Sequence, residues 1–231
     1  MAMRTAGGAG LIEWAYLIVV TTLVQAAVIG SLLILLPLSR IKRTWTGGVR
    51  YGTYFLVLGL AFLFVEIAFI QKFTLFLSHP LYAVAVVLAS FLVFAGIGSA
   101  YSERIAGRAT TLGFRPVSVA VAGIAAIAAI YLLALPALFG HFIGVADGLR
   151  VLLSVALIAP LAFFMGMPFP LGLKCVAEQA PDFVPWAWGI NGFASVISAV
   201  LATLLAVHFG FTAVIVLAVG LYFAAAALRV S

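Results

Sequence analysis

Glu66 is the residue whose type and position most strongly suggest chemistry. It stands in the run YFLVLGLAFLFVEIAFIQKF (54–73), where it is the only charge before Lys72. A charge in the middle of a membrane helix costs about 2.5–3.5 kcal/mol to insert, so ionisable residues there usually face the bundle interior and mark a site. If Glu66 faces inward, burial favours the neutral form of its carboxyl group. Helical spacing places five further residues on the same stripe, namely Phe55, Gly59, Phe62, Phe69 and Phe73.

Two interpretations of Glu66 stay open. The first is a binding site for a cation or a proton, and the second is a protonated carboxyl that hydrogen-bonds a neighbouring helix as a structural tie. Gln71 and Lys72 stand at the predicted outer end of the same run and complete the candidate intramembrane polar site. A lysine whose amine extends to the membrane interface also needs no functional explanation.

Three histidines, His79, His141 and His208, lie in stretches predicted to be loops on one side of the membrane. Histidine nitrogens bind zinc and haem iron, so convergence of the three would give a metal or haem site. No two of them have the i, i+4 spacing of a helical metal motif, and a single loop histidine is usually only solvated. We therefore predict no metal and no other cofactor, and we expect bound lipid.

A second group of notable residues begins the predicted sixth span, PWAWGINGFAS (185–195). Trp186 and Trp188 are interpreted as anchors at the membrane interface, where indole rings concentrate. Asn191 lies about one turn deeper and needs a hydrogen-bond partner. Small residues beside it, Gly192 and Ser195, would let a second helix approach closely, so a helix–helix contact is the favoured interpretation.

The composition excludes a water-soluble fold. Residues of the AVILMFWYC set make up 66% of the 231 residues, and charged residues only 8%, against roughly 45–50% and 25% in soluble domains. Disordered chains are polar and charge-rich, so disorder is excluded as well. The single cysteine, Cys175, excludes an intrachain disulfide and any site built from several cysteines. We predict a multi-pass protein of the cell's inner (cytoplasmic) membrane.

Long uncharged intervals give the number of spans. A helix needs about 20 apolar residues to cross the hydrocarbon, and the last interval, Asp182 to Arg229, is long enough for two helices with a break at His208-Phe209-Gly210. Lipid offers no hydrogen-bond partner to the backbone, so these spans must be helices. The prediction is a single all-α transmembrane domain with about seven spans, at 15–38, 51–71, 81–101, 117–139, 151–167, 187–207 and 211–228.

The string MGMPFP (165–170) cannot continue a regular helix, because each of its two prolines removes a backbone donor. The segment after it, LGLKCVAEQA (171–180), is predicted to contain a short interfacial helix. Asn191 and the MGMPFP break are expected near the inner face and Glu66 nearer the outer face. They are therefore not expected to form one site.

Lysine and arginine residues set the expected orientation, because they stay on the cytoplasmic side. Nine of them fall on one predicted side, chiefly in two loops, 39–50 with Arg40, Lys42, Arg43 and Arg50, and 102–116 with Arg104, Arg108 and Arg115. The other side holds Arg4, Lys72 and Arg150. The N-terminus is thus predicted outside and the C-terminus in the cytoplasm. Topology and anionic lipid headgroups explain the net charge of +6, so nucleic-acid binding is not implied.

Several strings resemble the membrane portion of the bacterial spermidine-synthase-like integral membrane proteins. They are YFLVLGLAFLFVEIAFIQKFTLFLSHPLYAVAVVL (54–88), FAGIGSAYSER (94–104), FMGMPFPLGL (164–173) and PWAWGINGFASVISAVLA (185–202). The resemblance implies a helical membrane module of the kind that family fuses to an aminopropyltransferase-like domain. That catalytic domain is water-soluble with a Gly-rich nucleotide loop, and no part of this chain is expected to form it, so aminopropyl transfer is not carried over.

GIGSAY (96–101) is not such a nucleotide loop, because it lacks the third glycine and ends a span instead of following a strand. Its Gly96 is assigned a helix-packing role. The favoured function is therefore a non-catalytic membrane subunit or anchor that packs with another membrane or membrane-associated protein and with lipid. The alternative is a transporter or binding protein for a small, polyamine-like organic cation, with Glu66 as counter-charge. An enzyme is not predicted, because no nucleophile–base pair is visible.

Overall fold

The computed structural model describes residues 2–36, 47–142 and 144–230, and these residues form helices joined by short turns, with no strand among them. The predicted all-α fold is confirmed for this part of the chain. In chain order the elements are α1 (Ala2–Gly30), the π-helix η1 (Ser31–Leu35), α3 (Gly48–Leu77), α4 (Pro80–Thr111), α5 (Pro116–Phe142), α6 (Asp147–Met165), α7 (Pro168–Gln179), the short 3₁₀ helix η2 (Pro181–Phe183) and α8 (Val184–Ala227).

Six helical stretches among the described residues are long and apolar enough to cross a membrane, judged by length and composition. They are 17–34 in α1, then α3, α4 and α5, then α6 with α7, and last η2 with α8. A multi-pass membrane protein is thus supported. Residues 37 and 38 of the first predicted span, and Arg40, Lys42 and Arg43, lie outside the described residues.

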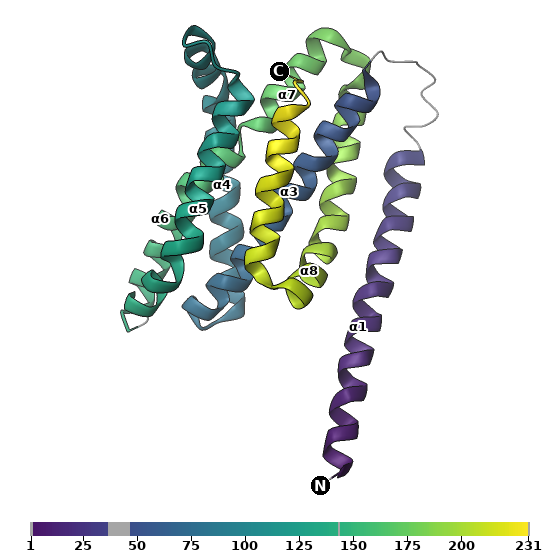
Figure 1. Cartoon of the computed structure of the whole chain (residues 1–231), viewed down its shortest axis with the longest axis vertical. Coiled ribbons are helices and arrows are strands. Elements are labelled where there is room, and N and C mark those ends of the chain that lie inside the picture. The colour runs from purple at the N-terminus through teal and green to yellow at the C-terminus, as the bar shows by residue number, and fades with distance from the viewer. Residues whose placement is uncertain (1, 37–46, 143, 231) are drawn as a thin grey trace.

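The longest helix, α8, is interrupted at one residue. Gly210 has φ 79° and ψ 162°, a backbone conformation that only glycine adopts readily. Figure 1 shows the chain reversing there, so that the segment 211–227 runs back alongside the bundle. The break that the sequence predicted at 208–210 therefore falls at Gly210.

The centre of the bundle is α3, which packs along α8 and also contacts α4 (Figure 1). In the most apolar part of α3, 61% of residues are buried, whereas only 6% are buried in the corresponding part of α1. In Figure 1, α1 lies to one side of the bundle and its N-terminal part extends beyond it. Its main neighbour is α8, where Gly30 meets the ring of Phe193.

Three helices extend well beyond the predicted spans. Helix α1 begins at Ala2, whereas the predicted first span begins at residue 15. The end predicted at Gln71 and Lys72 is wrong, because α3 continues to Leu77 and stops at Ser78, whose φ is +60°. Helix propagation fails only before His79-Pro80, where the proline restricts the preceding residue. The predicted loop at 102–116 is likewise helical to Thr111, because SERIAGRATT is polar without being a helix breaker.

The break between α6 and α7 falls where the sequence predicted it. Helix α6 ends at Met165, and α7 begins with Pro168 in its first turn, where a proline lacks no needed donor. The short helix predicted after the break is present as α7. Glycines bring α6 and α4 very close together here. A Cβ at Gly98 would lie 1.8 Å from the backbone oxygen of Phe163, and one at Gly166 would lie 2.0 Å from that of Ala95.

Candidate functional site

The main candidate site is a pocket of about 510 Å³ between α3, α4, the α6–α7 break and α8. Helices α4 and α8 both pack on α3 but not closely on each other, which leaves this space between them. We call it the central pocket. Its lining is mainly apolar and aromatic, with three polar side chains other than that of Tyr222, and consists of Leu58, Gly59, Phe62, Leu63, Leu92, Ala95, Gly96, Ser99, Met165, Gly166, Phe169, Pro170, Trp188, Asn191, Ser195 and Tyr222.

The contact between α3 and α8 forms one side of the central pocket. Asn191 Nδ2 donates a hydrogen bond to the backbone oxygen of Phe55 (3.1 Å), and Ser198 Oγ donates to that of Leu60 (2.8 Å). A Cβ at Gly59 would lie 2.5 Å from the backbone oxygen of Asn191. The absence of a side chain at Gly59 therefore lets the two helices approach until side-chain donors of α8 reach carbonyls of α3.

The start of α7 closes one end of the pocket. Tyr54 donates its phenolic hydrogen to the backbone oxygen of Pro168 (2.6 Å), and its ring lies against Gly172, where a Cβ would be 2.2 Å from a ring carbon. The ring of Phe169 meets Trp188 with centroids 4.7 Å apart. These contacts fix the aromatic side chains of the pocket on rigid elements.

Glu66 lies on α3 beyond the central pocket. It is 6% exposed, no hydrogen bond or ion pair joins it to another described residue, and neither of its oxygens is among the fully buried polar atoms that lack a partner. Phe62 and Leu63, which line the pocket, precede it by one helical turn. The orientation predicted for the Glu66 stripe is therefore observed, since Glu66 is buried with Phe55, Phe69 and Phe73.

Tyr222 connects Glu66 with the central pocket. It comes from the last segment of α8, is 1% exposed and lines the pocket. It also lies close enough to Glu66 and to Tyr54 for electrostatic interaction. A buried acid and a buried phenol from distant parts of the chain thus lie within electrostatic range of each other, and the phenol lines the pocket.

Gln71 and Lys72 do not join Glu66. They follow it by five and six positions, which places them roughly 140° and 120° away around α3 on opposite sides. Both are half-buried, and the side-chain oxygen of Gln71 is buried without a hydrogen-bond partner among the described residues. Of the three residues of the predicted polar site, only Glu66 therefore lies on the side of α3 that faces the central pocket region.

The three histidines are exposed and lie at one end of the bundle, which we call the histidine end. The ring of His79 contacts Tyr82, that of His141 contacts Phe142, and His208 Nδ1 lies 2.8 Å from the backbone oxygen of Leu204. Across residues 2–36, 47–142 and 144–230, no three His, Cys, Asp or Glu side chains come together as a metal site would require. The structure does not bring the histidines into one site.

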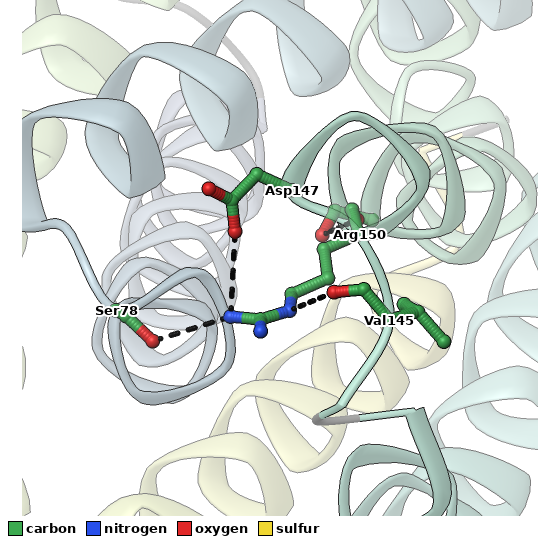
Figure 2. A network of polar contacts seen from close by, with 5 residues as sticks. Ser78, Val145, Asp147 and Arg150 are labelled. Carbon is green, nitrogen blue, oxygen red and sulfur yellow. Dashed lines mark hydrogen bonds and ion pairs between the residues drawn. The ribbon is translucent and has the colours of Figure 1, made fainter.

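A polar network also lies at the histidine end. Figure 2 shows Arg150 of α6 reaching Ser78 at the end of α3 (Nη1 to Oγ, 3.4 Å) and the backbone oxygen of Val145 (Nε, 3.0 Å). Asp147 lies 3.6 Å from the same guanidinium and is 84% exposed, so this pair adds little stability. The hydrogen bonds of Arg150 link the end of α3 to the start of α6, which is a structural role.

Other predicted residues differ in their surroundings. A Cβ at Gly192 or at Gly96 would meet nothing within 4 Å, so neither glycine provides a close helix approach, although Gly96 lines the central pocket. Ser195 Oγ donates to the backbone oxygen of Asn191 in its own helix (2.9 Å). Trp186 is half-buried and Trp188 is 59% exposed.

Sequence reasoning missed Tyr222, Tyr54, Ser198 and Gly98. Ser198 and Tyr222 are polar residues with apolar neighbours on both sides, and that position is the signal that could have drawn attention to them. Tyr54 and Gly98 stand among other polar or small residues, and the sequence gives no such signal for them. No known protein family, curated protein or solved structure matches this chain.

Proposed function

We propose that the protein binds a small organic cation inside its helix bundle, with Glu66 as the counter-charge. The observation that carries the proposal is the burial of Glu66 without a hydrogen bond or ion pair to another described residue, one turn from an aromatic pocket. A buried acid that only joined helices would need such a partner, because an unsatisfied polar group in an apolar interior is costly.

The chemistry of the central pocket suits an ammonium ion. Four aromatic side chains line it, those of Phe62, Phe169, Trp188 and Tyr222, and aromatic ring faces attract organic cations. Asn191 and Ser195 add oxygen atoms that can accept hydrogen bonds from an N–H group. The volume of about 510 Å³ falls within the roughly 300–1,000 Å³ typical of small-molecule sites.

Glu66 would act on the cation from just outside the pocket wall. One helical turn is about 5.4 Å, and at that range a carboxylate attracts a cation strongly where water is scarce. Without a cation, burial favours the neutral acid. Binding would then release the Glu66 proton, and Tyr222 would hold the carboxylate through its hydroxyl. In this proposal Glu66 and the central pocket act together, although the sequence pattern predicts that Glu66 and Asn191 lie near opposite faces of the membrane.

The proposal includes a topology. The break at Gly210 divides α8 into two crossings, so the protein crosses the bacterial inner membrane seven times with its N-terminus outside and its C-terminus in the cytoplasm. The support is the turn at Gly210 and the excess of lysine and arginine at one predicted side.

The test is binding of spermidine and of tetraethylammonium to the whole protein in mild detergent, measured by calorimetry. Glu66→Gln should weaken binding at least tenfold, because the charge is lost while the side-chain shape is kept. Glu103→Gln is the matched control, since Glu103 is an exposed acid paired with Lys174 outside the pocket, and its affinity should not change. Equal affinities in wild type and both variants, or no binding by wild type, would refute the proposal.

A second candidate function is a non-catalytic membrane subunit that anchors a partner protein. It is favoured by α1, whose apolar stretch is almost entirely exposed beside the bundle. The resemblance to spermidine-synthase-like membrane modules supports the same idea, and a polyamine is the cation that the family would suggest. Purification in mild detergent tests this candidate. A stoichiometric protein that is lost when residues 1–36 are deleted would support it, and a lone chain in both cases would contradict it.

A further inference from the structure

A second pocket, of about 600 Å³, lies where α4 turns into α5. We call it the hairpin pocket. Its walls are mainly apolar, with Ile105 and Leu112 from α4, Phe114 from the turn and Ala122 from α5, and its two polar side chains are Arg108 and Ser118. It is separate from the central pocket, with which it shares no lining residue.

The charge around the hairpin pocket is positive and not neutralised locally. Arg108 lines the pocket and Arg115 lies in the turn beside it, and neither forms an ion pair with a described residue. Glu103, two residues before Ile105 on α4, is bound to Lys174 of α7 at 2.8 Å. Arg104 is placed differently, because its guanidinium lies over the ring of Tyr101 at 5.2 Å.

The first turn of α5 adds to this field. Ser118 stands in that turn and lines the pocket. Pro116 has no N–H, and the N–H of Val119 donates to the backbone oxygen of Arg115. This leaves the N–H groups of Val117 and Ser118 and the partial positive charge of the helix end to favour an anion. A guanidinium, a hydroxyl and a helix N-terminus thus meet above an apolar cleft.

The depth of the pocket matches the membrane interface. Helix α4 has 32 residues, hence a length of about 48 Å, against about 30 Å of hydrocarbon. Its last turns, which carry Arg108, therefore lie at headgroup level. Ile105 and Ala122 lie on the side of the pocket nearer the hydrocarbon. This placement rests on the membrane-spanning arrangement, and it does not depend on cation binding in the central pocket.

We propose that the hairpin pocket binds one anionic phospholipid, with the phosphate at Arg108 and Ser118 and an acyl chain in the cleft between Ile105 and Ala122. Phosphate oxygens match the donors of a guanidinium, and an acyl chain matches the apolar walls. A zwitterionic lipid carries a cationic group that Arg108 and Arg115 repel, so it binds less well. The pocket thus fixes the α4–α5 hairpin to the leaflet rich in anionic lipid.

Native mass spectrometry of the detergent-purified chain tests this site, with phosphatidylglycerol, phosphatidylcholine and free glycerol phosphate added separately. Arg108→Gln should weaken phosphatidylglycerol binding about fivefold, as expected for one interfacial arginine. Arg104→Gln removes the same charge one turn away, outside the pocket lining, and should change binding less than twofold.

A second pair of variants tests the cleft. Ala122→Trp should fill it and abolish the retained lipid, whereas Ala126→Trp, at an exposed position of α5 outside the pocket, should keep it. The melting temperature shows whether each variant is folded. If Ala122→Trp does not fold, the result for Arg108→Gln alone decides whether the proposal stands. Equal binding of the two lipids, displacement by glycerol phosphate alone, or unchanged binding in Arg108→Gln would each overturn the proposal.

Discussion

Polar side chains inside the bundle along α3 and α8 fall into two kinds. The half-buried Asn191 and the buried Ser198 donate hydrogen bonds to backbone oxygens of α3, so they join helices. Glu66 is buried but forms no such bond with a described residue. The first kind stabilises the bundle directly, whereas the second costs free energy unless something else compensates for it.

Substitution of Ser198 and of Ser195 measures how much a side-chain hydrogen bond between helices stabilises the protein. Ser198→Ala should destabilise the protein by about 0.6 kcal/mol, the average for a hydrogen bond between membrane helices. Ser195→Ala should change stability by less than that, since this hydroxyl bonds only its own helix. Unfolding in a graded detergent mixture gives both values, and equal losses would contradict the assignment.

Glu66 gives the opposite prediction. Glu66→Met keeps the length of the side chain and removes an unsatisfied carboxyl, so it should stabilise the protein by about 1 kcal/mol while removing cation binding. The readout is the melting temperature in detergent without ligand. Destabilisation would instead mean that Glu66 is a structural tie, the other interpretation left open by its sequence.

The residues of the site could be predicted only in part. The burial of Glu66 and the aromatic stripe followed from helical spacing and the cost of a charge in lipid. The proximity of Glu66 to Tyr222 could not be predicted, because these residues lie far apart in the chain and the distance between them depends on how α8 folds back. The neighbours of Gly192 suggested a close helix contact there, yet the close contact between α3 and α8 is at Gly59. Which glycine faces a partner helix depends on the rotation of each helix about its axis, and the sequence does not show that rotation.

At the scale of elements, the crossing of α4 and α6 depends on glycine. Gly98→Ala would put a Cβ 1.8 Å from the backbone oxygen of Phe163, so the helices must separate, and we expect a loss of about 3 kcal/mol. Gly107→Ala, in the same helix with open space around it, should stabilise by about 0.5–1 kcal/mol. Thermal unfolding of the two variants measures the difference, and similar effects would show that α4 and α6 do not pack this tightly.

Element boundaries were predictable where backbone chemistry sets them. Pro168 and Pro170 lie in the first turn of α7 and separate it from α6, and Gly210 interrupts α8, for steric reasons that are readable from the sequence. The ends of α3 and α4 were placed too early, because hydropathy identifies the apolar part of a helix and not the helix itself. Charged residues such as Arg104 and Arg108 continue a helix well, so α4 extends past the apolar stretch.

The whole molecule has two unlike ends. The described arginines and lysines at 50, 104, 108, 115, 174 and 229 lie toward the end that holds the C-terminus and α7, which we call the basic end (Figure 1). The histidine end carries Lys72, Asp147 and Arg150 together with the three histidines. The proposed orientation rests on this difference in charge, because the end rich in lysine and arginine is expected on the cytoplasmic side.

Cysteine labelling tests the orientation. In a Cys175→Ala background, Thr111→Cys marks the basic end and Gly148→Cys marks the histidine end, both at exposed positions. With a membrane-impermeant maleimide, Gly148→Cys should react in intact spheroplasts and Thr111→Cys only after lysis. The reverse pattern would invert the topology, and reaction of both before lysis would exclude the spanning arrangement.

The return of α8 after Gly210 has a consequence for biosynthesis. Glu66 leaves the ribosome with α3, whereas Tyr222 belongs to the segment of α8 after Gly210 and is made later. The carboxyl group is therefore synthesised well before the phenol that lies close enough to interact with it electrostatically. The segment 211–227, which runs back along the bundle, thus brings a buried phenol toward an acid that was made earlier with α3.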